Sequence, residues 1–142
     1  MYKEDFHIYL SKNTKIDLET IKTLFEKNGD DVFQVALTLN SDYGIDKAKL
    51  GKLWGTYLGF AYVDPNTTIV KPEYLEKAGV NFILETQALP LYKFGRAVTV
   101  TTSDPLNPYL QNKMERKLDE IVSLVFCFPF DIKNYLVTHN IK

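Results

Sequence analysis

Few side chains in this 142-residue chain are spaced as a catalytic or metal site would require. His7 and His139 are the only histidines, and neither has a cysteine or carboxylate at the spacing of a metal-binding motif. The single cysteine, Cys127, excludes an internal disulfide and indicates a reducing compartment. It lies in the apolar run 121–128, which favours a buried core residue over a nucleophile.

The acidic and glycine-containing motifs have structural explanations as well. Asp30-Asp31 fits a capping pair at a helix start, and Asp104-Pro105 fits a turn that leads into a helix. The nearest fragment of a phosphate-binding loop is Gly51-Lys52-Leu53, which lacks the first glycine and the hydroxyl residue of G-x-x-x-x-G-K-[ST] and falls within a predicted helix. We therefore expect a protein that is not an enzyme, with no catalytic residue, no metal ion and no cofactor.

The bulk composition narrows the range of partners. Seventeen basic residues against eighteen acidic ones leave a formal charge of -1, and no basic run is present, which argues against a nucleic-acid partner. No apolar stretch approaches the roughly 20 residues that span a membrane, and the first residues lack the apolar core of a signal peptide. We expect a cytoplasmic protein without direct membrane insertion.

An internal repeat organises the first sixty residues. When the chain is shifted by 29 positions, Asp17 falls on Asp46 and apolar residues fall on apolar residues. The matched apolar pairs are Phe6/Val35, Leu10/Leu39, Ile16/Ile45, Ile21/Leu50, Leu24/Leu53 and Phe25/Trp54. Each copy has the spacing of a helix, a short turn and a second helix.

Capping residues predict where these helices begin and end. Asp17 and Asp46 can accept backbone N–H bonds at a helix start, each preceded by an isoleucine placed as a staple, and Gly59 supplies a helix stop. Four helices are expected at roughly 3–12, 17–27, 31–41 and 46–58. None is long enough to be stable alone, so they must pack together into a helical repeat lobe over residues 1–58.

Residues 59–142 follow a mixed pattern. A strand-like run at 60–63 precedes short helices at 72–78 and about 81–85, and Gly95 is the turn of a hairpin between strands 88–94 and 97–102. A helix at about 107–118, a strand at 121–128 that we expect at the centre of the sheet, and a helix at about 130–138 complete the lobe. The prediction is an α+β fold: a helical N-terminal lobe of two helix-turn-helix repeats, then a small sheet covered by helices.

The residues from Leu58 to Asp64 resemble a known signature. Leu58-Gly-Phe-Ala-Tyr-Val-Asp64 is similar to the "LGLPYVD" sequence in the amino-terminal domain of general secretion (GspE) and type IV pilus assembly ATPases. The order of elements that follows also fits, and the upstream repeat resembles the tandem helical motifs of the MshEN type of this domain.

The resemblance implies a non-catalytic docking and regulatory domain of type II secretion or type IV pilus assembly. Its implied partner is a protein, namely a cytoplasmic segment of an inner-membrane assembly protein, at the inner face of that membrane. The chain is then either a segment of a longer ATPase or a free-standing copy of the domain.

Some members of the MshEN type bind cyclic di-GMP through a repeated R-L-G-x-x-L-x-x-x-G pattern and a later glutamine. At the matching positions the second copy has Gln34, Ala36, Tyr43 and Tyr57, and the first has Asp5, His7, Thr14 and Asn28. Both arginines are missing, and Asp5 stands where a phosphate would approach. We therefore expect cyclic di-GMP to be an unlikely ligand, and keep a cyclic di-GMP-binding domain with a diverged motif as the alternative function.

The aromatic residues could form a partner surface instead. Nine Tyr and nine Phe exceed what a small core needs, and Tyr57, Tyr62, Tyr92 and Tyr109 are candidates for exposure. Tyr43 and Tyr57 replace residues that would have faced a ligand, so we expect them near one another on the exposed side of the helical lobe. The alternative is that both rings only fill the groove that a ligand would occupy.

Overall fold

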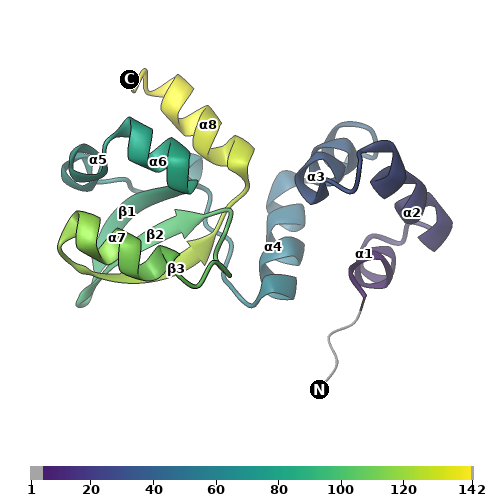
Figure 1. Ribbon diagram of the computed structural model, residues 1–142. Coiled ribbons are helices and arrows are strands. Elements are labelled where there is room, and N and C mark those ends of the chain that lie inside the picture. Colours follow the sequence, from purple (N-terminus) through teal and green to yellow (C-terminus); the bar gives the residue numbers. More distant parts are fainter. Residues whose placement is uncertain (1–4, 142) are drawn as a thin grey trace. The chain divides into compact units, whose positions relative to one another are not determined.

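Four short helices form the first part of the chain, in a computed structural model that describes residues 5–141 (Figure 1). They are α1 (Phe6–Thr14), α2 (Leu18–Lys27), α3 (Val32–Ser41) and α4 (Lys47–Leu58). The chain divides by its internal contacts into two units, and the boundary lies between Tyr57 and Leu58.

The core of the helical unit is built from the repeat. In three of the matched pairs both members are at most 4 % exposed, and these pairs are Leu10/Leu39, Ile21/Leu50 and Phe25/Trp54. The two copies therefore contribute equivalent side chains to one interior, which explains why apolar type is retained at these positions while their neighbours differ.

Two aspartates cap helices of this unit through their carboxylates. Asp5 Oδ1 accepts the His7 N–H at the start of α1, and Asp31 Oδ1 accepts the Phe33 and Gln34 N–H groups at the start of α3. Asp17, which was expected to cap in this way, occupies the N-cap of α2 without a side-chain bond. Its backbone carbonyl accepts the Ile21 N–H instead.

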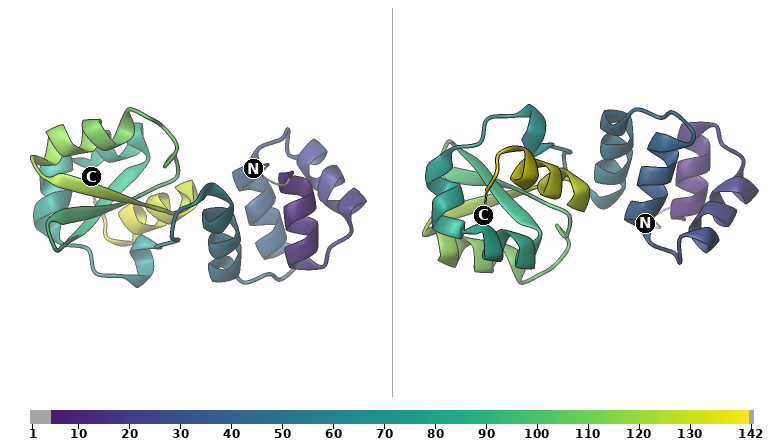
Figure 2. Two further views of the ribbon diagram at one scale, coloured as in Figure 1. Left: turned by 90° about the horizontal axis from the view of Figure 1, so that it is seen from below. Right: turned by 90° about the horizontal axis from the view of Figure 1, so that it is seen from above.

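The second unit is a three-stranded sheet with helices on both sides. It contains the short 3-10 helix η1 (Pro65–Thr67), α5 (Pro72–Ala78), α6 (Val80–Thr86), β1 (Ala88–Phe94), β2 (Ala97–Thr102), α7 (Leu110–Leu118), β3 (Ile121–Phe126) and α8 (Pro129–Thr138). Figure 2 shows α7 and α8 on opposite sides of the sheet. The α+β class and the succession of a helical part and a small sheet are confirmed.

The sheet has the order β1-β2-β3, with an antiparallel β1–β2 hairpin and a parallel β2–β3 pair. The hairpin turns at Gly95, whose φ of +63° lies in the left-handed region that glycine adopts without strain. The prediction that strand 121–128 is central was wrong, because β2 is the middle strand. Three buried threonines, Thr99, Thr101 and Thr102, make the sequence of β2 look less apolar than its position is.

The run at 60–63 is not a strand of this sheet. Tyr62 forms an isolated bridge with Phe126, where the Val63 N–H donates to Phe126 O and the Phe126 N–H donates to Ala61 O. The pairing stops there because Asp64 caps the 3-10 helix that begins at Pro65. The segment therefore covers only the last residue of β3.

Side chains of α7 cover the other end of the outer edge of β3. Gln111 Nε2 donates to Val122 O at 3.0 Å, and the Val122 N–H donates to Glu115 Oε2 at 2.9 Å. Both backbone groups of Val122 are thus satisfied by a helix rather than by another strand.

A buried carboxylate connects the start of α8 to the segment before η1. Asp131 is fully buried, and its Oδ2 accepts the Tyr62 hydroxyl at 2.9 Å and the Phe128 N–H at 3.0 Å. Asn66 Nδ2 joins the same network by donating to Asp131 O and to Asp64 Oδ1. Burial, more than the neighbouring carboxylates, raises the pKa of Tyr62 far above its ordinary value of 10.0.

We predict that Tyr62→Phe destabilises the protein by about 1–3 kcal/mol at pH 8, because it removes a hydrogen-bond donor from a buried carboxylate. The variant should also lose less stability in alkali. A pKa that is higher in the folded state gives stability that is complete below the unfolded value near 10 and declines above it, by about 1.4 kcal/mol per pH unit and group. Urea unfolding at pH 8 and above pH 10 measures both effects.

Tyr109→Phe is the matched control, since the Tyr109 side chain is 78 % exposed. Equal unfolding free energies for Tyr62→Phe and the unmodified protein at pH 8 would contradict the role of this hydrogen bond.

Candidate functional site

The first turn of α1 carries two of the motif positions that the sequence singled out. The Asp5 carboxylate accepts the His7 N–H at 2.9 Å, and its Oδ1 lies 3.2 Å from His7 Nδ1. Both side chains are partly exposed, and the imidazole meets the edge of the Phe25 ring with 4.4 Å between the ring centroids. The start of α1 therefore presents a carboxylate and an imidazole in a fixed arrangement.

An aromatic cluster lies beside this pair and joins α1 to α4. The Phe6 ring is 4.6 Å from the Tyr57 ring and 5.1 Å from the Trp54 ring, measured between centroids. It also meets the edge of Phe25 at 6.1 Å. Contacts of this length stabilise aromatic pairs beyond the burial of their area, so the last turns of α4 are held against the first turn of α1.

Tyr9 extends the cluster toward solvent. Its ring lies 5.0 Å from that of Tyr57, and its hydroxyl donates to Leu53 O at 2.7 Å. Burial raises the pKa of Tyr9 from its usual value. Tyr9 and Tyr57 are both half-buried, so each keeps part of its ring accessible.

The structure places the other motif positions of the first copy in local contacts. Thr14 Oγ1 donates to Leu10 O at 2.6 Å, and Asn28 Nδ2 donates to Leu24 O at 2.8 Å. Each side chain thus bonds to its own helix, and neither is hydrogen-bonded to Asp5 or His7.

The motif positions of the second copy are scattered. Gln34 is exposed in the first turn of α3, whereas Ala36 is only 1 % exposed and belongs to the core. Tyr43 precedes α4 and is 43 % exposed, whereas Tyr57 lies in the last turn of that helix. Because a helix of this length spans about 18 Å, the structure does not bring the two tyrosines together.

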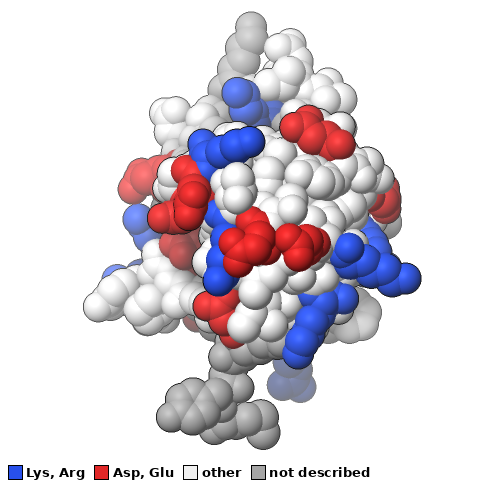
Figure 3. Space-filling model, turned by 90° about the vertical axis from the view of Figure 1, so that its right-hand side faces the viewer, with Lys and Arg blue, Asp and Glu red and all other residues white. Residues whose placement is uncertain are grey.

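Other candidates from the sequence lie in structural positions. Asp31 caps α3, Asp104 accepts a bond from the Asn107 side chain in a turn, and Cys127 is fully buried. Between residues 5 and 141 no group of three metal-ligating side chains is gathered, and no helix there has the length and apolar character of a membrane span. On the face seen in Figure 3, acidic and basic side chains are interspersed.

The α1–α4 surface is suited to a flat, partly polar ligand. Half-exposed aromatic rings offer a stacking surface, and a carboxylate and an imidazole beside them offer hydrogen-bonding groups. Tyr9 was not among the site residues predicted from the sequence. Its position three residues after Phe6, on the same helical face, was the available signal.

Comparison with known proteins identifies a family and a fold. The sequence matches the family described as the MshEN domain over residues 58–140. A solved structure described as "Structure of MshE with cdg" matches with a TM-score of 0.67 and 13 % sequence identity, and the match covers 95 % of this chain and 98 % of that one. A search of curated proteins finds no match.

These findings correct two predictions from the sequence. The preference for a protein-docking module over a cyclic di-GMP-binding domain was wrong. So was the expectation that cyclic di-GMP is an unlikely ligand, since the matching protein is described with that ligand. The prediction considered two arginine positions alone, whereas a ligand is recognised by the whole set of groups around it.

We predict that Tyr57→Ala lowers the free energy of unfolding by about 2 kcal/mol or more, because the ring packs on Phe6 and Tyr9. Tyr43→Ala should change it by less than about 0.5 kcal/mol, because that exposed ring packs on no other aromatic ring within residues 5–141. Urea unfolding followed by circular dichroism at a helical wavelength measures both. Equal effects of the two substitutions would contradict the assignment of Tyr57 to the cluster.

Proposed function

The chain belongs to the MshEN domain family, and from that premise we propose that it is a regulatory domain that binds cyclic di-GMP. One observation carries the proposal. The match to MshE with cdg extends over 95 % of this chain, a share that must include most of the helical unit upstream of the family match. The helical unit of this chain therefore has a structural counterpart in the protein that is described with the ligand.

The proposed site is the surface between the first turn of α1 and the last turn of α4. The accessible parts of the Tyr9 and Tyr57 rings, 5.0 Å apart between centroids, provide a surface on which a guanine base can stack. Stacking on an aromatic ring contributes about 1–3 kcal/mol per base. This contribution requires no arginine, so the site can use it although the motif arginines are replaced.

Asp5 and His7 supply polar recognition in this proposal. Guanine carries N–H donors on its Watson–Crick edge, and an ionised carboxylate is purely an acceptor, so Asp5 suits the base rather than a phosphate. One Asp5 oxygen already accepts the His7 N–H, which fixes the direction of the side chain. His7, when protonated, donates to a phosphate oxygen.

We predict that the full chain binds cyclic di-GMP with a dissociation constant on the order of 10 µM in titration calorimetry. Asp5→Asn should weaken binding about tenfold, because the amide replaces one charged acceptor oxygen by a donor. Asparagine caps helices as well as aspartate does, so the variant should keep its fold. Cyclic di-AMP, whose bases lack the guanine donor pattern, should bind more weakly than cyclic di-GMP.

Asp31→Asn is the matched control, since Asp31 caps α3 as Asp5 caps α1. Absence of binding heat for the unmodified chain at millimolar ligand would contradict the proposed function. Tighter binding of cyclic di-GMP by Asp5→Asn would be consistent with the proposed function, but it would contradict the proposal that the Asp5 carboxylate accepts hydrogen bonds from guanine.

Membership of this family also supports a role for the domain in the regulation of an assembly ATPase. We propose that the domain regulates an ATPase of a type IV pilus or secretion machine at the cytoplasmic face of the inner membrane, and that it performs no catalysis of its own. The 142 residues contain no G-x-x-x-x-G-K-[ST] sequence, so nucleotide hydrolysis regulated by this domain would take place elsewhere.

We further propose that residues 1–58 and 59–142 are separate domains. Gly59 is exposed and directly follows α4, whereas Ala61 and Val63 are bonded to β3, so the chain is least restrained close to Gly59. Limited proteolysis of the full chain should therefore cut at 58–60 and leave two protected fragments. First cuts within α2 or α7 would contradict the domain boundary.

A further inference from the structure

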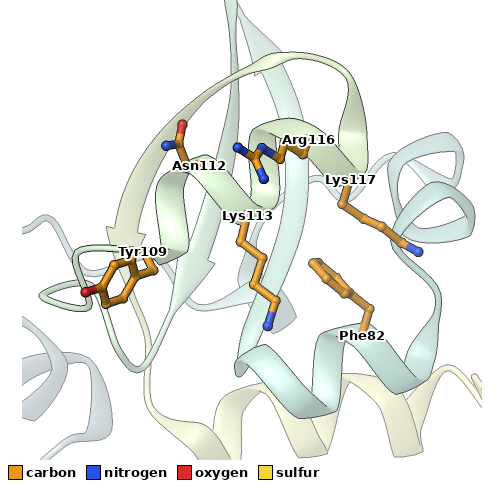
Figure 4. A pocket seen from close by; sticks show the side chains of 6 residues that line it. All are labelled: Phe82, Tyr109, Asn112, Lys113, Arg116 and Lys117. Carbon is orange, nitrogen blue, oxygen red and sulfur yellow. The ribbon is translucent and has the colours of Figure 1, made fainter.

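A pocket of about 520 Å³ lies on the α+β unit, between α6 and the outer face of α7. Phe82 comes from α6, and the other lining residues come from α7 and the residue before it: Tyr109, Asn112, Lys113, Arg116 and Lys117. Figure 4 shows the Lys113 and Lys117 side chains reaching down toward the Phe82 ring. The volume is within the range of about 300–1,000 Å³ that small-molecule sites occupy.

The periodicity of α7 places these groups together. Leu110, Met114 and Leu118 are at most 2 % exposed and fix the inner face of the helix. Asn112 and Arg116 then point away from that face, whereas Lys113 and Lys117 lie on the flank next to α6, where both approach the Phe82 ring. The cations are therefore held as a group on one side of a helix whose other side is locked into the core.

The pocket combines positive charge with an aromatic floor. Lys117 Nζ lies 5.2 Å from the centroid of the Phe82 ring, and Lys113 Nζ lies 5.9 Å from it. Lys113 has a single ion pair, with exposed Glu85 on α6 at 3.4 Å. Three cations thus face one carboxylate, and the charge excess favours an anionic ligand.

Arg116 is the strongest anion-binding group in the pocket. It is one of two arginines in the sequence, and it forms no ion pair with another residue between 5 and 141. Its planar guanidinium can bind a phosphate with two parallel hydrogen bonds. Attraction to the negative end of the helix accounts for basic residues in the last turn of α7, but it accounts for neither Lys113 nor the ring of Phe82 beneath it.

We propose that this pocket binds a purine nucleoside monophosphate or a close analogue, with the phosphate on Arg116 and Lys113 and the base on the exposed aromatic surface. Phe82 and the 78 % exposed Tyr109 supply rings for stacking. The Asn112 amide supplies a donor and an acceptor for the edge of the base. The site lies wholly in the α+β unit, so it is separate from the α1–α4 site and does not depend on the function proposed for it.

Two-dimensional ¹H–¹⁵N NMR of the full chain titrated with GMP tests the proposal. Shifts should concentrate at Phe82 and residues 109–117, rather than at residues 5–9 and 57, which would report the α1–α4 site. The double substitution Lys113→Gln and Arg116→Gln should weaken GMP binding at least tenfold, since each lost charge-assisted contact typically lowers affinity by about that factor or more. It should leave cyclic di-GMP-induced shifts at residues 5–9 unchanged.

Arg96→Gln is the matched control, because Arg96 is exposed in the β1–β2 turn, outside the pocket. Inorganic phosphate and guanosine are the comparison probes, and each should bind more weakly than GMP. No shifts at residues 109–117 with GMP would overturn the proposal. Equal affinity for phosphate and GMP would overturn it as a nucleotide site, since the ring would then contribute nothing.

Discussion

The carboxylate of Asp131 is fully buried at the start of α8, where it accepts the Tyr62 hydroxyl and the Phe128 N–H. A buried carboxylate costs several kcal/mol unless its oxygens are satisfied, so the positions of these donors are constrained together. Tyr62 in turn lies in the segment whose neighbours bond to Phe126 at the end of β3. One buried group therefore connects α8, η1 and β3, and the residues that resemble a family signature have a structural role in this connection.

The helical unit is stabilised in a different way, by apolar side chains that the two repeat copies bury at equivalent positions. Its helices are each 9–12 residues long, too short to be stable alone, and the repeat gives each copy the same buried positions. The copies then diverge at their ends. Phe6, Tyr9 and Tyr57 form a cluster between α1 and α4, whereas the equivalent of Phe6 in the second copy is Val35, which is completely buried. The repeat thus supplies a common scaffold, and the aromatic surface forms where α1 of the first copy meets α4 of the second.

Structural features that are determined by residues close together in the sequence were predicted correctly in most cases. The hairpin at Gly95, the repeat pairs and the starts of α2, α3 and α4 rest on spacings of a few residues or on one constant shift, and the structure contains them. The helix predicted from about residue 107 begins at Leu110. Features that depend on distant pairs were missed. Tyr62 meets Asp131 across 69 residues, and the basic pocket forms only when Phe82 of α6 lies under the cations of α7. The order of strands was also missed, because the buried threonines of β2 conceal its central position.

The α1–α4 site shows the same limit. The family pattern directed attention to Tyr43 and Tyr57 as a pair, but sequence positions do not reveal that α4 separates them. The residues that do adjoin Tyr57 come from the other repeat, and their pairing requires the folded arrangement of α1 and α4. The prediction against cyclic di-GMP likewise rested on two individual arginine positions, whereas the affinity for a ligand depends on all the groups that surround it.

The bonds from Gln111 and Glu115 to Val122 have a consequence for solubility. A three-stranded sheet has an outer strand whose open hydrogen-bonding groups could pair with the same strand of another molecule and begin aggregation. Here α7 occupies both backbone groups of Val122, and the bridge at Phe126 occupies the far end of the strand. A second copy would have to displace the Gln111 and Glu115 side chains before it could pair with this end of β3. The helix that carries the basic pocket on one flank thereby opposes self-association through side chains on its other flank.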